Sequence, residues 1–73
     1  MKKKLNILVI GSGAREHSIC WSLSKSEKTN KLFCIPGNAG ISKIASCEEI
    51  NPVDKKSILK FCNEKKIELV VIG

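Results

Sequence analysis

The chain has 73 residues and a net charge of +6, a length that limits it to one small domain and leaves no room for a large enzyme active site. A basic chain can bind nucleic acid through the phosphate backbone, but twelve of the thirteen basic residues are lysines and only three aromatic residues are present to stack on bases. We therefore expect solvated lysines and no nucleic-acid partner.

The four cysteines predict buried free thiols and no metal site. Cys20, Cys34, Cys47 and Cys62 are separated by 14, 13 and 15 positions, which matches neither paired zinc knuckles nor a CxxC redox pair. Each lies in or beside an apolar run, where a free cysteine behaves as a small hydrophobic residue in a reducing compartment. We expect core or near-core thiols in a cytoplasmic protein.

No apolar run approaches the roughly 20 residues that a membrane-spanning helix needs. The start of the chain, MKKKLNILVI, has the charge of a secretion signal, but its apolar run is short, contains Asn6 and stops at Gly11. We expect no membrane partner.

A buried strand and a helix are the first predicted elements. Residues 5–10 are a continuous apolar run rich in branched side chains that ends at a glycine, which is typical of a strand covered on both faces. Residues 14–24 predict a helix, because Ile19, Cys20 and Leu23 fall on one stripe at the helical period. We expect that stripe to face the sheet.

A second, shorter strand is predicted at residues 31–35, where Pro36 and Gly37 end it. The next stretch, residues 41–50, is weakly patterned and predicts a short helical turn and a minor strand.

A second helix is predicted to begin at Asn51 as its N-cap. Pro52 would take the first helical position and Asp54 the third, where a carboxylate can accept free backbone donors. The expected apolar face of this helix consists of Ile58, Leu59, Phe61 and Cys62. Residues 64–66 would end the helix before residues 68–72 form another buried strand.

Strands that alternate with helices predict parallel pairing through right-handed crossovers. The expected fold class is therefore α/β, a partial Rossmann-like open parallel sheet with flanking helices, whose binding crevice lies beyond the carboxyl ends of the strands. The loops after the first two strands and Gly73 all belong to that edge. Only half of such a fold is present, so we expect a bare sheet edge that implies missing sequence or a partner.

The first candidate site is the glycine turn Gly11, Ser12 and Gly13. It joins a strand to a helix start, where backbone N–H groups and the helix dipole favour an anion such as phosphate. A tight turn with no ligand is the alternative. A dinucleotide-binding module is a second alternative, but its GxGxxG fingerprint needs a third glycine where this chain has Glu16, and no acidic residue ends the second strand.

Arg15, Glu16 and His17 follow this turn directly. Arg15 is the only arginine in the chain, and a guanidinium can hold a phosphate at two points, which a lysine does not do. A surface ion pair is the alternative role for Arg15. Glu16 could accept backbone donors at the helix start or orient Arg15. His17 could donate to a ligand hydroxyl or simply be satisfied by packing.

The second candidate site is the loop Pro36, Gly37, Asn38, Ala39 and Gly40. It could be only a turn, since proline and glycine both interrupt regular structure. Two glycine loops at the same end of adjacent parallel strands, however, would bring backbone donors together, and Asn38 adds an amide that both donates and accepts. That arrangement suits a phosphorylated sugar.

Three segments resemble the start of the phosphoribosylamine-glycine ligase family. They are ILVIGSGAREHSICWSL at residues 7–23, CIPGNAGI at residues 34–41 and LVVIG at residues 69–73. The family opens with a strand, a GSGxREH turn, a helix bearing tryptophan, a second strand and a PGNAG loop. The resemblance spans nearly the whole chain, with Ala14 standing where the family often has glycine.

The resemblance implies that residues 1–73 are the N-terminal, pre-ATP-grasp portion of a ligase, with the ATP-grasp and C-terminal domains absent. Such enzymes use ATP and magnesium (or manganese) to join glycine to 5-phosphoribosylamine in purine biosynthesis, giving glycinamide ribonucleotide, ADP and phosphate. The positions that match the family's phosphoribosyl-binding part are the glycine turn with Arg15 and the PGNAG loop. The nucleotide and metal ligands lie in later domains, so no catalytic, cofactor or metal residue is expected here, and this portion alone is expected to be inactive.

Overall fold

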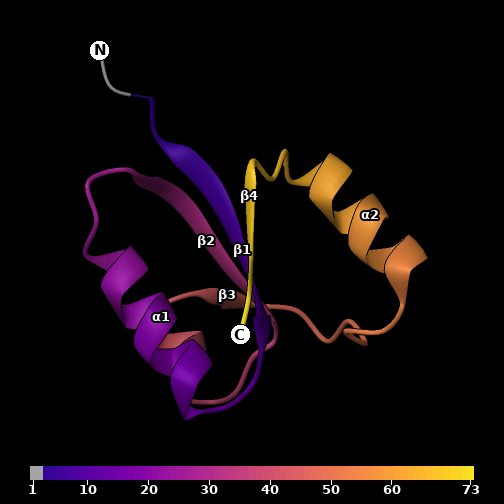
Figure 1. The fold of residues 1–73 in the computed structure, drawn as a ribbon, viewed down its shortest axis with the longest axis horizontal. Coiled ribbons are helices and arrows are strands. Elements are labelled where there is room, and N and C mark those ends of the chain that lie inside the picture. The colour runs from indigo at the N-terminus through magenta and orange to yellow at the C-terminus, as the bar shows by residue number, and fades with distance from the viewer. Residues whose placement is uncertain (1–2) are drawn as a thin grey trace.

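Four parallel strands form the centre of the computed structural model, which describes residues 3–73. The elements in chain order are β1 Leu5–Gly11, α1 Ala14–Ser24, β2 Thr29–Pro36, the 3-10 turn η1 Ile41–Lys43, β3 Ser46–Cys47, α2 Lys55–Glu64 and β4 Leu69–Ile72. The strands lie in the order β3-β2-β1-β4 (Figure 1). This confirms the predicted open α/β sheet.

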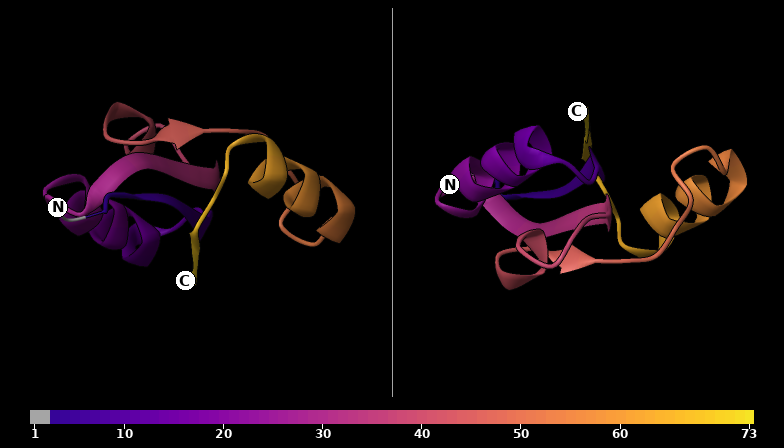
Figure 2. Two further views of the ribbon diagram at one scale, coloured as in Figure 1. Left: turned by 90° about the horizontal axis from the view of Figure 1, so that it is seen from above. Right: turned by 90° about the horizontal axis from the view of Figure 1, so that it is seen from below.

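The two helices lie on opposite faces of the sheet (Figure 2). On the α1 face, the α1-side cluster consists of the buried residues Ile7, Val9, Cys20, Cys34 and Ile41. On the α2 face, the α2-side cluster consists of Leu8, Phe33, Ile35 and Phe61. Alternate residues of β1 therefore enter different clusters, as expected of a strand covered on both faces.

Helix α1 packs on the sheet through the stripe that its sequence predicts. Cys20 is fully buried, and Ile19 and Leu23 pack against the α1-side cluster. Trp21 lies off this stripe and is 56% exposed, with the Lys25 amine 5.7 Å from its ring centre.

Helix α2 begins later than predicted, because Asp54 and not Asn51 is its N-cap. The Asp54 carboxylate accepts hydrogen bonds from the backbone N–H of Ser57 at 3.2 Å and from its hydroxyl at 2.7 Å. These bonds, the hydroxyl first, lower the pKa of Asp54. The Asn51 side chain instead accepts from the N–H of Val53 at 3.0 Å, which forms a turn before the helix.

The predicted apolar face of α2 was wrong at one position. Phe61 is buried, and Ile58 and Cys62 are half-buried against the α2-side cluster, but Leu59 is 66% exposed. Ile58, Phe61 and Cys62 lie on one side of the helix at the helical period, and Leu59 lies at the edge of that side.

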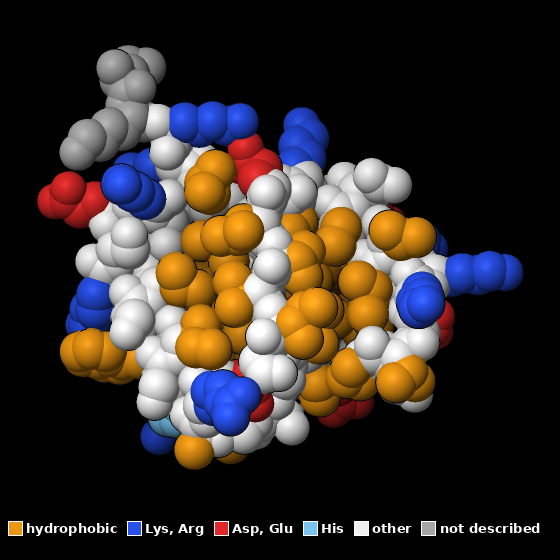
Figure 3. Space-filling view, in the orientation of Figure 1, with side chains coloured by type: hydrophobic (Ala, Val, Ile, Leu, Met, Phe, Trp, Pro, Cys, Tyr) orange, Lys and Arg blue, Asp and Glu red, His pale blue; other side chains and the backbone are white. Residues whose placement is uncertain are grey.

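Strand β4 forms a bare edge of the sheet, as the sequence predicts, but the prediction that residues 68–72 form a buried strand is wrong, because no strand or helix among residues 3–73 covers this edge. Its residues Leu69 and Val70 are each 42% exposed and Ile72 is 78% exposed. Apolar side chains gather on both sides of the backbone in the middle of this face, where β4 runs (Figure 3). Just before the strand, the Glu68 carboxylate accepts a hydrogen bond from the N–H of Asn6 at 3.1 Å and forms a salt bridge with the Lys3 amine at 2.6 Å.

Within residues 3–73, the structure contains no helix with the length and apolar character needed to span a membrane.

Candidate functional site

The two glycine loops lie side by side at the carboxyl ends of β1 and β2. We call residues 11–13 loop 1 and residues 37–40 loop 2. The strand register ends with Gly11 opposite Pro36, and the N–H of Gly37 then donates to the carbonyl of Gly11 at 3.1 Å. The predicted convergence of the two loops is therefore confirmed.

Each loop contains one glycine in a conformation that other residues rarely adopt. Gly11 has φ +145° and Gly37 has φ +70°. The space beside each is also filled: a Cβ at Gly11 would collide with the Glu16 side chain, and one at Gly37 would collide with the sulfur of Cys47. Both glycines are therefore required by backbone shape and by close packing.

Glu16 acts within the protein as an internal anion for loop 1. Its Oε1 accepts the N–H of Gly13, the N-cap of α1, at 2.8 Å. The same side chain lies against Gly11 and against Gly73 at the end of β4. A carboxylate here is favoured by the helix dipole, and it occupies the space beside loop 1.

Arg15 and His17 differ in their surroundings. Arg15 is exposed in the first turn of α1, and no ion pair of its guanidinium occurs among residues 3–73. The His17 ring lies over loop 2, with its Cε1 3.0 Å from the point that a Cβ of Gly40 would occupy. Arg15 is thus available to a ligand, whereas His17 packs against the neighbouring loop.

Two hollows flank the joined loops. One, of about 390 Å³, is lined by Ala14, His17, Ser18, Trp21 and Ser22 on the outer side of α1. The other, of about 470 Å³, lies beside loop 2 and is lined by Pro36, Gly37, Asn38, Ala39, Ser42, Cys47 and Glu49. Residues from both predicted sites therefore border open space.

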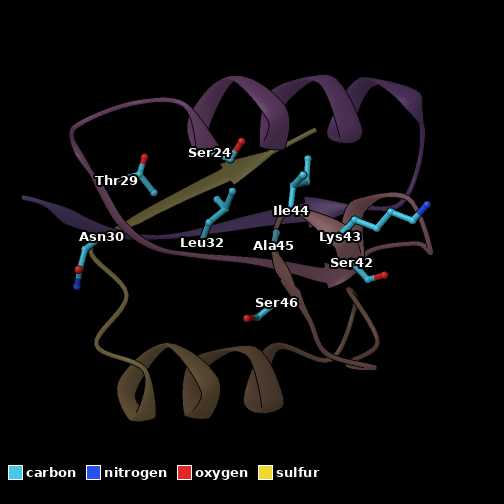
Figure 4. A pocket seen from close by; sticks show the side chains of 9 residues that line it. All are labelled: Ser24, Thr29, Asn30, Leu32, Ser42, Lys43, Ile44, Ala45 and Ser46. Atoms are coloured by element: carbon cyan, nitrogen blue, oxygen red, sulfur yellow. The ribbon is translucent and has the colours of Figure 1, made fainter.

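A third hollow, of about 420 Å³, lies away from the loops (Figure 4). Its side chains come from the end of α1, the start of β2 and the segment from η1 to β3. It contains none of the predicted site residues, so we place the candidate site at the loops.

Cys34 and Cys47 contact the backbone of the two loops, a role that the sequence did not predict. The thiol of fully buried Cys34 donates to the carbonyl of Gly11 at 3.3 Å, and burial raises its pKa to about 12. Cys47 packs under Gly37. In the sequence, the only indication of this role is that Cys34 lies two positions before Pro36. The spacing of Cys47 gives no indication that it lies under loop 2.

All four cysteines are free thiols, with Cys20 and Cys34 buried and Cys47 and Cys62 half-buried, which confirms the predicted core or near-core positions. Burial raises the pKa of Cys20 and of Cys62 as well. In the described part of the chain, no group of three or more histidine, cysteine or acidic side chains has the arrangement of a metal site.

Comparison with known proteins gives a consistent result. The family described as phosphoribosylglycinamide synthetase, N domain, matches residues 5–73. A phosphoribosylamine–glycine ligase of Halalkalibacterium halodurans is 44% identical over 69 residues, and one of Mesorhizobium japonicum is 42% identical over 69 residues. Each match covers 94% of this chain and 16% of the relative.

A longer relative is the trifunctional purine biosynthetic protein adenosine-3 of Drosophila melanogaster, which is 43% identical over 72 residues. That match covers 92% of this chain and 5% of the relative. The chain thus spans a small part of the length of the relatives it matches. Because the family match covers nearly the whole chain, including both glycine loops, the chain belongs to the phosphoribosylglycinamide synthetase N-domain family.

Proposed function

We propose that this chain is the N-terminal substrate-binding part of an ATP-dependent ligase that joins glycine to 5-phosphoribosylamine, giving glycinamide ribonucleotide, ADP and phosphate. The observation that carries the proposal is the junction of loops 1 and 2 beside the first turn of α1, in a chain related to proteins named phosphoribosylamine–glycine ligase. The free thiols fit a reducing compartment, the cytoplasm.

The chemistry of the loops supports a phosphorylated sugar as the ligand. The first N–H groups of a helix have no acceptor within the helix, and in α1 only that of the N-cap Gly13 is taken by a side chain, Glu16. The N–H groups of Ala14 and Arg15, together with the exposed Arg15 guanidinium, remain as donors for a phosphate. In our proposal these groups bind and orient the phosphoribosyl group.

ATP and a divalent cation would supply activation of the glycine carboxylate as an acyl phosphate. Residues 3–73 contain no cluster of acidic, histidine and cysteine side chains suited to such a cation. The family resemblance implies that nucleotide and metal binding belong to other parts of the enzyme, and in our proposal this chain orients the substrate.

A dinucleotide-binding module is a weaker alternative. Glu16 folds over Gly11 and bonds Gly13, so a carboxylate occupies the place where a pyrophosphate would approach the glycine turn. Tight NAD binding by the protein would favour the alternative.

Replacing Arg15 tests the proposal. We expect Arg15→Lys to raise the KM for phosphoribosylamine, because two-point phosphate contact is lost, and Arg15→Gln to raise it by about tenfold or more. Lys25→Gln is a matched control, because it removes the same charge from the other end of α1. Steady-state kinetics of the ligase reaction, measured in the intact enzyme with its remaining domains present, provide the measurement, and an unchanged KM in Arg15→Gln would contradict the role of Arg15.

A graft tests the wider assignment. This chain would replace the matching 69 residues of the Halalkalibacterium halodurans ligase, to which it is 44% identical. We expect the chimera to form glycinamide ribonucleotide and to lose affinity for phosphoribosylamine when Arg15 is changed to Gln. A folded chimera that binds ATP but has no affinity for phosphoribosylamine would contradict the assignment.

A further inference from the structure

Asn38 connects the two loops through both ends of its side-chain amide. Its Nδ2 donates to the carbonyl of Ser12 in loop 1 at 2.7 Å. Its Oδ1 accepts the N–H of Ile41, which follows loop 2, at 2.8 Å. The side chain is on the surface, yet the acceptor and one of the two amide hydrogens are already used within the protein.

The Ser12–Gly13 peptide unit is held from both sides. Its carbonyl accepts from Asn38, and its N–H donates to the Glu16 carboxylate at 2.8 Å. A peptide unit is planar, so bonds at its two ends fix the orientation of the whole plane. This plane leads directly into the first turn of α1, where the free donors lie.

We propose that Asn38 is a positioning residue of the substrate site, which fixes the Ser12–Gly13 peptide together with Glu16 and does not itself contact the substrate. The inference rests on the proposed function in one respect only, the identity of the ligand. Asn38 acts through the backbone of loop 1: when the Ser12 carbonyl is held, the N–H groups of Ala14 and Arg15 keep one direction toward the phosphate.

Two variants of Asn38 separate its two bonds. Asn38→Ala removes both. Asn38→Asp keeps an oxygen for the N–H of Ile41, so loop 2 retains its turn, and replaces the donor to Ser12 by a charged oxygen that cannot bond the carbonyl. Asn30→Ala is the matched control, because Asn30 also donates from Nδ2, to Asn6 at 2.9 Å, but at the start of β2.

The first measurement uses the protein without ligand. Hydrogen exchange and the NMR shift of the Gly13 N–H report whether the peptide is held. We expect Asn38→Ala and Asn38→Asp to increase the exchange rate of this proton by about tenfold, with no change in Asn30→Ala. Unchanged Gly13 exchange in Asn38→Asp would overturn the proposal whatever the ligand is.

The second measurement is the kinetics of the ligase reaction in the intact enzyme, or in the chimera with the Halalkalibacterium halodurans ligase. We expect Asn38→Ala to raise the KM for phosphoribosylamine by about tenfold while kcat stays within about twofold, because the donors are misdirected but the reacting groups are untouched. A higher KM with unchanged Gly13 exchange would indicate direct contact between Asn38 and the substrate, and would also overturn the proposal. If the wild-type protein shows no affinity for phosphoribosylamine, the proposed function fails, and Gly13 exchange alone still decides the positioning role.

Discussion

The two faces of the sheet differ in how closely the elements that cover them are packed. On the α1 face, the α1-side cluster joins α1, η1 and the two central strands, and Val9, Cys20, Cys34 and Ile41 in it are fully buried. On the α2 face, the helix reaches the sheet mainly through Phe61, which meets Phe33 edge-on with ring centres 5.3 Å apart. Leu59 of α2 and Ile72 of β4 stay largely exposed.

The candidate site belongs to the better-packed face. Cys34 and Ile41 lie directly under or beside the two loops and are fully buried. Side chains fixed by close packing hold a loop in one conformation, and donors held in one conformation bind a ligand without a further ordering cost. We therefore expect the rigidity of loops 1 and 2 to depend more on the α1-side cluster than on α2.

The largest expected effect tests this difference in packing. We expect Ile41→Ala to lower the free energy of unfolding by roughly 2–5 kcal/mol, because a fully buried side chain would leave a cavity beside loop 2. Leu59→Ala is the control on the exposed side of α2 and is expected to change stability by less than about 0.5 kcal/mol. Urea unfolding followed by circular dichroism gives both values. Equal losses would show that Ile41 is no better packed in solution than exposed Leu59.

A smaller effect is expected from the aromatic contact on the α2 face. Phe61→Leu keeps an apolar residue but removes the edge-on contact with Phe33, whose ring plane lies at 87° to it. We expect a loss of about 2 kcal/mol in unfolding free energy, with loops 1 and 2 unchanged by NMR. Trp21→Leu removes an exposed aromatic ring and should cost less than about 1 kcal/mol. Shifted loop signals in Phe61→Leu would contradict the independence of the two faces.

The last expected effect is seen only at alkaline pH and is a loss of stability on the α1 face. The pKa of Cys34 rises on folding from 9.0 to about 12, so its contribution to stability is complete below pH 9.0 and is lost as the pH rises toward 12.

The measurement is the unfolding free energy of wild type and Cys34→Ala between pH 8 and about pH 11. The variant should show a flatter pH dependence, whatever its absolute stability. Cys62→Ala, on the half-buried α2 side, is the control and should flatten the curve less. Parallel curves for wild type and Cys34→Ala would show that folding does not raise the pKa of the Cys34 thiol.

The sequence alone was sufficient for the order of elements, because apolar periodicity and glycine positions are local signals. The strand at residues 5–10, the stripe of α1 and the meeting of the two loops at one edge were all predicted correctly. Local signals also misplaced two boundaries. The second strand, predicted as a short strand from residue 31, begins at Thr29 and is longer than β1. For the second helix, Asn51 and Asp54 are both good N-caps by composition. Only the path of the chain decides that Asn51 forms the preceding turn and Asp54 caps the helix.

The tertiary structure alone decided how the candidate site is held together. The bond from Asn38 to Ser12 spans 26 positions, and Glu16 reaches Gly73 at the far end of the chain. Such pairs leave no periodic trace in a single sequence, because each depends on strands that pair only after folding. The sequence therefore determined which residues gather at the carboxyl edge of the sheet and that Glu16 could accept a backbone donor at the helix start. The tertiary structure decided that Asn38 bonds to loop 1, that Glu16 also lies against Gly73 and that Arg15 stays exposed.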